Sequence, residues 1–142
     1  MISLHMAPMV PAHSSIVVEG GCEVQEDKSI LPLAMLGHTH SLGTLVQLWR
    51  MREGEWELLG KVVGSDPQSF YNLTESRVGQ GDWLVGSCEM ISDRDTDTHH
   101  GLASYQEMCN IYMLYSVEGD QTNLMQGNTY CIIPQHKSWG SF

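Results

Sequence analysis

Two histidines lie two residues apart in the tripeptide His38-Thr39-His40, after the apolar residues 30–36 and before Gly43. On a β-strand, residues two apart point to the same face, so these two imidazoles converge while Thr39 points away. Two imidazole nitrogens aimed at one point can bind a metal ion. The tripeptide therefore predicts a metal site. The alternative is a chance pair, with one ring capping a turn and the other in solvent.

The nature of the third ligand decides which metal fits. In cupins, which are also β-barrels, a paired-histidine motif is followed within four or five residues by a glutamate ligand. The corresponding stretch here, residues 41–45, reads Ser-Leu-Gly-Thr-Leu and has no carboxylate. This disfavours a cupin, although a carboxylate from elsewhere in the fold leaves that interpretation open.

Methionine is a further candidate ligand, since the chain has nine methionines and a thioether favours Cu(I) over zinc or iron. Most of them are expected to fill the core. Met108 differs from the others because it precedes Cys109, and a crosslink at Cys109 would immobilise it at the start of a strand. The alternative is that Met108 is only a core residue.

The elements that must position these residues are expected to be β-strands. Six segments are rich in β-branched, aromatic and other apolar residues: 15–19, 31–36, 44–50, 56–63, 83–90 and 110–117. Turn-forming residues separate them, with Glu53-Gly54 at a hairpin turn. This pattern predicts an all-β protein, an antiparallel, jelly-roll-like β-sandwich. We expect residues 92–100 to form an exposed loop, residues 1–134 to form one domain and residues 135–142 to be a loose tail.

Length and charge narrow the function classes. A chain of 142 residues can bury the core of one domain. The net charge of −10, with only seven Lys and Arg, argues against nucleic acid and anionic membrane surfaces as partners. No apolar run approaches the roughly 20 residues of a membrane span, and the start of the chain lacks the pattern of a signal peptide. We therefore expect a protein that has no membrane span and does not bind a polyanionic partner.

Four cysteines lack the C-x-x-C spacing of zinc knuckles and thioredoxin-type redox pairs. Two disulfides are therefore expected, and the sequence alone leaves three connectivities open. Disulfides indicate a secreted protein or a secretory-pathway lumen. The sequon Asn72-Leu73-Thr74 agrees with this location and predicts a glycoprotein. The four cysteines are Cys22, Cys88, Cys109 and Cys131.

The segments His38–Gly43 and Glu107–Tyr112, with the spacing between them and the four cysteines, resemble the second catalytic domain of the copper type II, ascorbate-dependent monooxygenases. The resemblance runs from about residue 5 to residue 131 and is nearest to the peptidylglycine-hydroxylating branch. It implies one copper ion bound by His38, His40 and Met108, where oxygen binds and a substrate C–H bond is hydroxylated.

The same resemblance implies disulfides Cys22–Cys131 and Cys88–Cys109. It also implies substrate contacts by Asn110 and Tyr112, which match the peptide branch.

Two positions depart from that branch. Leu36 lies where the peptide branch has an arginine that binds the terminal carboxylate of the substrate, and Ser41 lies where it tends to have a third histidine. Without that arginine, carboxylate recognition loses its strongest element. The substrate is therefore less well defined than the metal.

The remaining histidines are assigned lesser roles. His99-His100 is read as a loop pair near the site, with His99 a candidate for orienting a ligand or the substrate. His5, His13 and His136 are expected at the solvated surface.

The resemblance also implies partners. Each turnover in this family draws two electrons from ascorbate, and a second copper is held by three histidines of a preceding domain. We expect that domain to lie before Met1, so that the chain alone binds copper without efficient turnover. Two other interpretations remain: a copper-binding module without hydroxylase activity, and a purely structural sandwich.

Overall fold

The computed structural model describes residues 1–25, 27, 29–117 and 130–132, which form strands and no helix. One sheet contains β1 (Ile2–Met6), β4 (Ile30–Thr39), β7 (Tyr71–Asn72), β10 (Cys109–Val117) and β11 (Tyr130–Ile132). The other contains β3 (Ser15–Glu23), β5 (Gly43–Arg52), β6 (Glu55–Val63) and β8 (Trp83–Ile91). A small separate pair contains β2 (Met9–Val10) and β9 (Thr98–His99).

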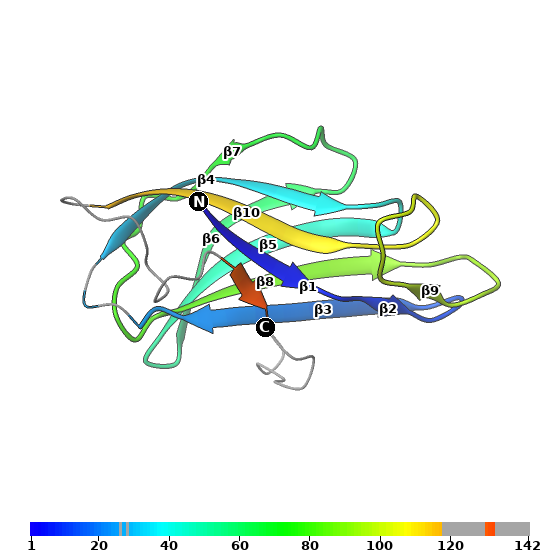
Figure 1. Cartoon of the computed structure of the whole chain (residues 1–142), viewed down its shortest axis with the longest axis horizontal. Helices are drawn as coiled ribbons and strands as arrows, with labels where there is room; N and C mark the ends of the chain where they lie inside the picture. Colours follow the sequence, from blue (N-terminus) through cyan, green and yellow to red (C-terminus); the bar gives the residue numbers. More distant parts are fainter. Residues whose placement is uncertain (26, 28, 118–129, 133–142) are drawn as a thin grey trace.

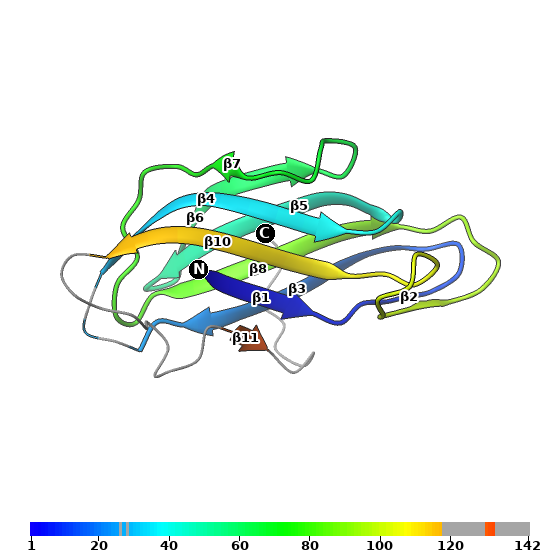
Figure 2. The same ribbon diagram turned by 45° about the horizontal axis from the view of Figure 1, so that its top comes forward.

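The two large sheets pack face to face (Figure 1). Their strand orders are β11-β1-β10-β4-β7 and β3-β8-β5-β6. Figure 2 shows the first sheet in front, with β4, β10 and β1 side by side, and the second sheet behind it. Neighbouring strands are antiparallel except β1 and β11, which are parallel. The chain crosses repeatedly between the sheets, so the predicted antiparallel, jelly-roll-like sandwich is confirmed.

All six expected strands are present, and β1 is an additional one. Its residues are buried on both faces apart from half-buried His5. Its sequence, Ile-Ser-Leu-His-Met, alternates apolar and polar residues, so periodicity could have revealed this strand. The polar positions Ser3 and His5 are nevertheless covered together with the apolar ones. The expected surface position of His5 is wrong for the same reason, whereas the His13 side chain is 63% exposed beside Asp95.

Both disulfides have the pairing that the resemblance implies. Cys88–Cys109 joins β8 of one sheet to β10 of the other, with Cα atoms 6.0 Å apart. Cys22–Cys131 joins β3 to β11 with a Cα separation of 5.8 Å. The sandwich is thus crosslinked between its layers at two separate points.

Two local expectations meet different outcomes. The hairpin turn is confirmed, since Glu53 and Gly54 both have positive φ angles, 51° and 87°. Residues 92–100 are only partly an exposed loop, because Thr98 is buried in β9 and Ser92 is buried as well.

The expected tail, residues 135–142, and His136 lie outside the described residues. No helix in the described part of the chain is long and apolar enough to cross a membrane.

An ion pair stabilises the end of the sandwich near the Glu53-Gly54 turn. Arg52 donates from Nε and Nη2 to the two carboxylate oxygens of Asp82, both at 2.6 Å. The amide of Gly79 donates to the same carboxylate at 2.8 Å. Burial acts to raise the pKa of Asp82, but the hydrogen bonds from Arg52 and Gly79 outweigh it, and the pKa is lowered.

We predict that Asp82→Asn lowers the free energy of unfolding by about 1–3 kcal/mol at pH 7, because the Arg52 and Gly79 donors lose the carboxylate charge. A lowered pKa stabilises the fold above the unfolded value of about 4, and this stabilisation is lost as the pH falls through the folded pKa. The difference between variant and wild type should therefore shrink in acid. Urea denaturation at pH 7 and pH 3 measures it, with exposed Asp93→Asn as control. A pH-independent difference contradicts the prediction.

Candidate metal centre

The paired histidines lie at the end of β4, on the outer face of the five-stranded sheet. His38 is inside the strand and His40 directly follows it; both are half-buried, while Thr39 between them is buried. The ring centroids are 5.3 Å apart at an interplanar angle of 81°. Gly43 permits this turn, because a Cβ there would lie 2.2 Å from Oγ1 of Thr39. The burial of Thr39 between two half-buried histidines is the alternation expected from the sequence.

Hydrogen bonds decide which ring nitrogen is available to a metal. Nδ1 of His40 lies 2.8 Å from the main-chain carbonyl oxygen of Gln106. A carbonyl oxygen only accepts, so Nδ1 carries the hydrogen and donates it, and Nε2 keeps its lone pair. Nδ1 of His38 is likewise engaged, by Oε1 of Gln68. Both rings thus offer Nε2.

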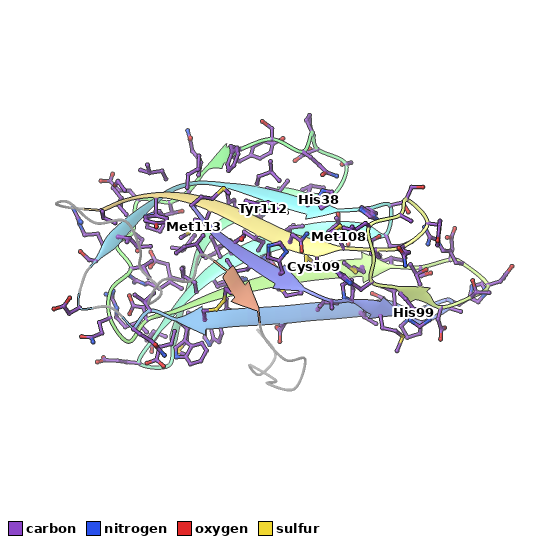
Figure 3. The ribbon with its side chains drawn as sticks, viewed as in Figure 1. His38, His99, Met108, Cys109, Tyr112 and Met113 are labelled. Carbon is purple, nitrogen blue, oxygen red and sulfur yellow. A yellow bond between two sulfur atoms is a disulfide. The ribbon has the colours of Figure 1, made fainter. Side chains whose placement is uncertain are left out.

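Met108 lies next to these histidines because β10 pairs with β4. Asn110 is opposite His38, and Cys109 is opposite Thr39. Met108 directly precedes Cys109, the first residue of β10, and is half-buried. Figure 3 shows Met108, directly before β10, and His38 of the neighbouring strand β4 in the same part of the sheet. The Cys88–Cys109 disulfide anchors the adjacent residue, as the sequence predicted.

The buried carboxylate of Glu107 connects the two segments. Its Oε1 accepts hydrogen bonds from the amides of His40 and Met108, and its Oε2 accepts one from the amide of Leu42 at 2.8 Å. The side chain is fully buried. One carboxylate therefore fixes the main chain at a candidate ligand on each side of the site.

Chemically, the site offers two imidazole nitrogens and a thioether. The described residues contain no group of three His, Cys, Asp or Glu side chains that could hold a metal. Glu107 is close to His40, but its oxygens are taken by amides. A carboxylate-completed site of the cupin type therefore has no support here, whereas nitrogen and sulfur donors suit copper.

The residues beside the histidines form rows across β4, β10 and β1. Asn110 lies between His38 and His5, and Tyr112 is opposite Leu36. Cross-strand partners share a face of the sheet, so these side chains lie on the face that carries the histidines. The His5 ring packs edge-on against Tyr112 at 5.7 Å between centroids.

Asn110 has an unusual environment. It is fully buried, and neither its Nδ2 nor its Oδ1 has a hydrogen-bond partner among the described residues. A buried amide normally finds partners, and each unsatisfied group costs about 1–3 kcal/mol.

The other residues named from the sequence lie at the margin of the site. Ser41 accepts a hydrogen bond from Arg94 at 2.8 Å. The exposed His99 lies apart on β9, opposite Met9, and its main-chain carbonyl accepts from the Glu107 amide at 3.0 Å (Figure 3). Exposed His100 bridges to Glu107 through the main chain.

A hollow of about 420 Å³ beside His40 is lined by Ser41, Gly43, Thr44, Val63, Gly64 and Ser65.

Sequence reasoning missed Gln68 and the role of Glu107. A glutamate between a polar loop and a strand gives no sign that it will be fully buried. Gln68 lies in a turn-rich segment thirty residues from His38, and only the folded chain brings them together. Gln68 and Glu107 thus hydrogen-bond to the residues proposed as ligands.

Nearly the whole chain matches a known family. The sequence profile of the copper type II ascorbate-dependent monooxygenase C-terminal domain matches residues 1–137, so the chain belongs to this family. Peptidyl-glycine alpha-amidating monooxygenase of Mus musculus is 40% identical over 83 residues, covering 57% of this chain and 8% of the mouse protein. Peptidyl-glycine alpha-amidating monooxygenase B of Xenopus laevis is 29% identical over 119 residues, covering 82% of this chain and 14% of that protein. The chain thus spans a small part of these relatives.

We predict that Glu107→Gln lowers the free energy of unfolding by about 3 kcal/mol or more. The new NH2 group has to replace one acceptor oxygen and faces main-chain N–H donors, which leaves buried donors unsatisfied. Chemical denaturation measures the loss, and hydrogen exchange should accelerate at the amides of His40, Leu42 and Met108.

Glu89→Gln is the matched control, because Glu89 is exposed on β8. If Glu107→Gln and Glu89→Gln have equal stability and equal amide exchange, the carboxylate does not hold the site together.

Proposed function

We propose that this chain is the substrate-hydroxylating copper domain of a peptidylglycine-type monooxygenase. In this proposal one copper ion is held by Nε2 of His38, Nε2 of His40 and the thioether of Met108. Ascorbate is the reductant and molecular oxygen the co-substrate, and the substrate is a peptide ending in glycine. The geometry that supports it most directly is the convergence of His38 and His40 with both Nδ1 atoms already engaged.

The donor set suits the chemistry of the family. Bound copper supplies one-electron redox chemistry and an open position for oxygen, and a thioether favours its reduced state. The chain's own residues orient the donors: Gln106 and Gln68 engage the ring nitrogens that face away from the metal, and Glu107 fixes the main chain at His40 and Met108. The half-buried ligands leave a side open to a substrate.

Asn110 and Tyr112 are the proposed substrate contacts. The amide of Asn110 has a donor and an acceptor without partners, and the peptide group of a substrate can satisfy both. Tyr112 lies one row further from the metal, between Leu36 and Ser3. A substrate bound along this face would extend from the metal, past Asn110, to Tyr112.

A second domain and a secretory location complete the proposal. Turnover requires a three-histidine copper domain, which this chain does not supply from its described residues. Two disulfides suit an oxidising compartment, and Asn72 of the sequon is exposed on β7, where a glycan can be attached. The alternative, a copper-binding module without hydroxylase activity, is favoured by Leu36 at the position opposite Tyr112.

We predict that X-ray absorption of the Cu(I)-loaded chain shows a sulfur scatterer that Met108→Ile removes, because isoleucine keeps the apolar bulk without the thioether. Met9→Ile is the control, since Met9 is 49% exposed on β2, which pairs with β9 and not with β4 or β10, the strands beside the proposed ligands. A sulfur signal that survives in Met108→Ile, or copper binding unchanged by that substitution, contradicts the ligand assignment.

We also predict that the chain alone consumes little oxygen with ascorbate and a glycine-extended peptide, and that a supplied three-histidine domain makes consumption and hydroxylation coupled. Leu36→Arg should then lower KM for this peptide about tenfold or more, because a bidentate guanidinium–carboxylate pair contributes about 1.5–3 kcal/mol. Leu33→Arg, at an exposed position of the same strand, is the control.

Three outcomes discriminate. Fast coupled hydroxylation by the chain alone contradicts the need for a second domain. Copper binding without hydroxylation, even with that domain, favours the module. An unchanged KM in Leu36→Arg means that the carboxylate is not bound near β4.

A further inference from the structure

The two candidate histidine ligands are oriented by different kinds of group. The hydrogen-bond acceptor for Nδ1 of His40 is a main-chain carbonyl, which no substitution removes. The acceptor for Nδ1 of His38 belongs to a side chain, that of Gln68. The orientation of His38 thus depends on a single replaceable residue.

We propose that Gln68 is a positioning residue that selects the Nδ1–H tautomer of His38 and so presents Nε2 to the metal. The inference rests on the proposed copper site for its consequence, but its structural part concerns the metal-free chain. Gln68 does not contact the metal in this proposal and acts through His38.

The direction of the Gln68 amide follows from its second contact. Its Nε2 donates to the main-chain carbonyl of Thr39 at 2.9 Å, and that carbonyl requires a donor. The NH2 group is therefore committed to Thr39, and the carbonyl oxygen Oε1 is the atom that meets Nδ1 of His38. Since Oε1 only accepts, His38 has to donate from Nδ1, and its Nε2 is left without a hydrogen.

The segment that carries Gln68 is itself attached to the site. The hydroxyl of Tyr71 donates to the carbonyl of Pro67 at 2.8 Å, next to Gln68. Tyr71 lies in β7, opposite Met35 of β4, the strand that carries His38. Gln68 thus contacts His38 from a segment that is itself attached to β4. This attachment fixes the position of the Gln68 side chain relative to His38.

The exposure of Gln68 separates this role from a purely structural one. The residue is exposed, so replacing it opens no core cavity. Outer-shell hydrogen bonds to metal-binding histidines fix the tautomer and ring orientation, and their loss typically lowers metal affinity about 10–100-fold. Gln68 substitutions should therefore affect His38 and metal affinity with little change in stability.

The test uses Gln68→Leu, Gln68→Glu and the control Gln80→Leu. Gln80 is also exposed and donates to the main-chain carbonyl of Gln25. It follows Val78, which pairs with Ile30 at the opposite end of β4 from His38. Two-bond nitrogen–proton NMR correlations of the metal-free chain, well above the ordinary histidine pKa of about 6.5, report each ring's tautomer.

In the wild type, both His38 and His40 should be Nδ1–H tautomers. Gln68→Leu should move His38 toward the Nε2–H form while His40 stays unchanged, and Cu(I) affinity should fall about tenfold or more. Gln68→Glu keeps an acceptor for Nδ1 of His38 but loses the donor to the Thr39 carbonyl, and it should still preserve the His38 tautomer. Gln80→Leu should change neither ring, and thermal unfolding should be similar in all four proteins.

The proposal is overturned if His38 keeps its tautomer in Gln68→Leu, or if His40 changes as much as His38. It is also overturned if the His38 tautomer changes while Cu(I) affinity at a Met108-dependent site does not. If Met108→Ile leaves copper binding unaltered, the proposed copper site fails, and the NMR result on the metal-free chain still decides what Gln68 does.

Discussion

The buried carboxylate of Glu107 is the interaction on which the geometry of the site depends. It accepts from main-chain amides on both sides of the site, at His40 and Leu42 after β4 and at Met108 before β10. A carboxylate buried away from water is costly unless such donors surround it, and charge-assisted hydrogen bonds from amides are among the stronger ones. Because the bonds are to the main chain, they set the path of both segments whatever their side chains are.

The disulfide next to Met108 extends this constraint to the second sheet. Cys109 is opposite Thr39 in the first sheet and bonded to Cys88 in the other. The start of β10 is therefore fixed from within its own sheet by Glu107 and across the core by the disulfide. His38 differs, because the group that holds its ring is an exposed side chain. The position of Met108 thus depends on buried groups, whereas the orientation of His38 depends on an exposed side chain.

Much of this could be predicted from the sequence where the signal is local. Alternation and turn residues predicted the sandwich, and the spacing of His38 and His40 predicted rings on one face. The pairing of the cysteines required the family resemblance, because spacing alone cannot choose a connectivity. Strand β1 was missed although its five residues alternate between apolar and polar, whereas Gln68 was missed because contacts between distant segments leave no local pattern.

The polar groups of the candidate site are satisfied unequally, and this asymmetry separates the proposed ligands from the proposed substrate contact. Around the proposed ligands, the Nδ1 atoms of both histidines and the oxygens of Glu107 have partners within the chain. On the other side, one row away, the Asn110 amide is buried without any in the described residues. A buried amide without hydrogen-bond partners lowers the stability of the fold. Violations of this kind are typical of functional sites, which makes Asn110 the physical argument for the proposed substrate contact on this face.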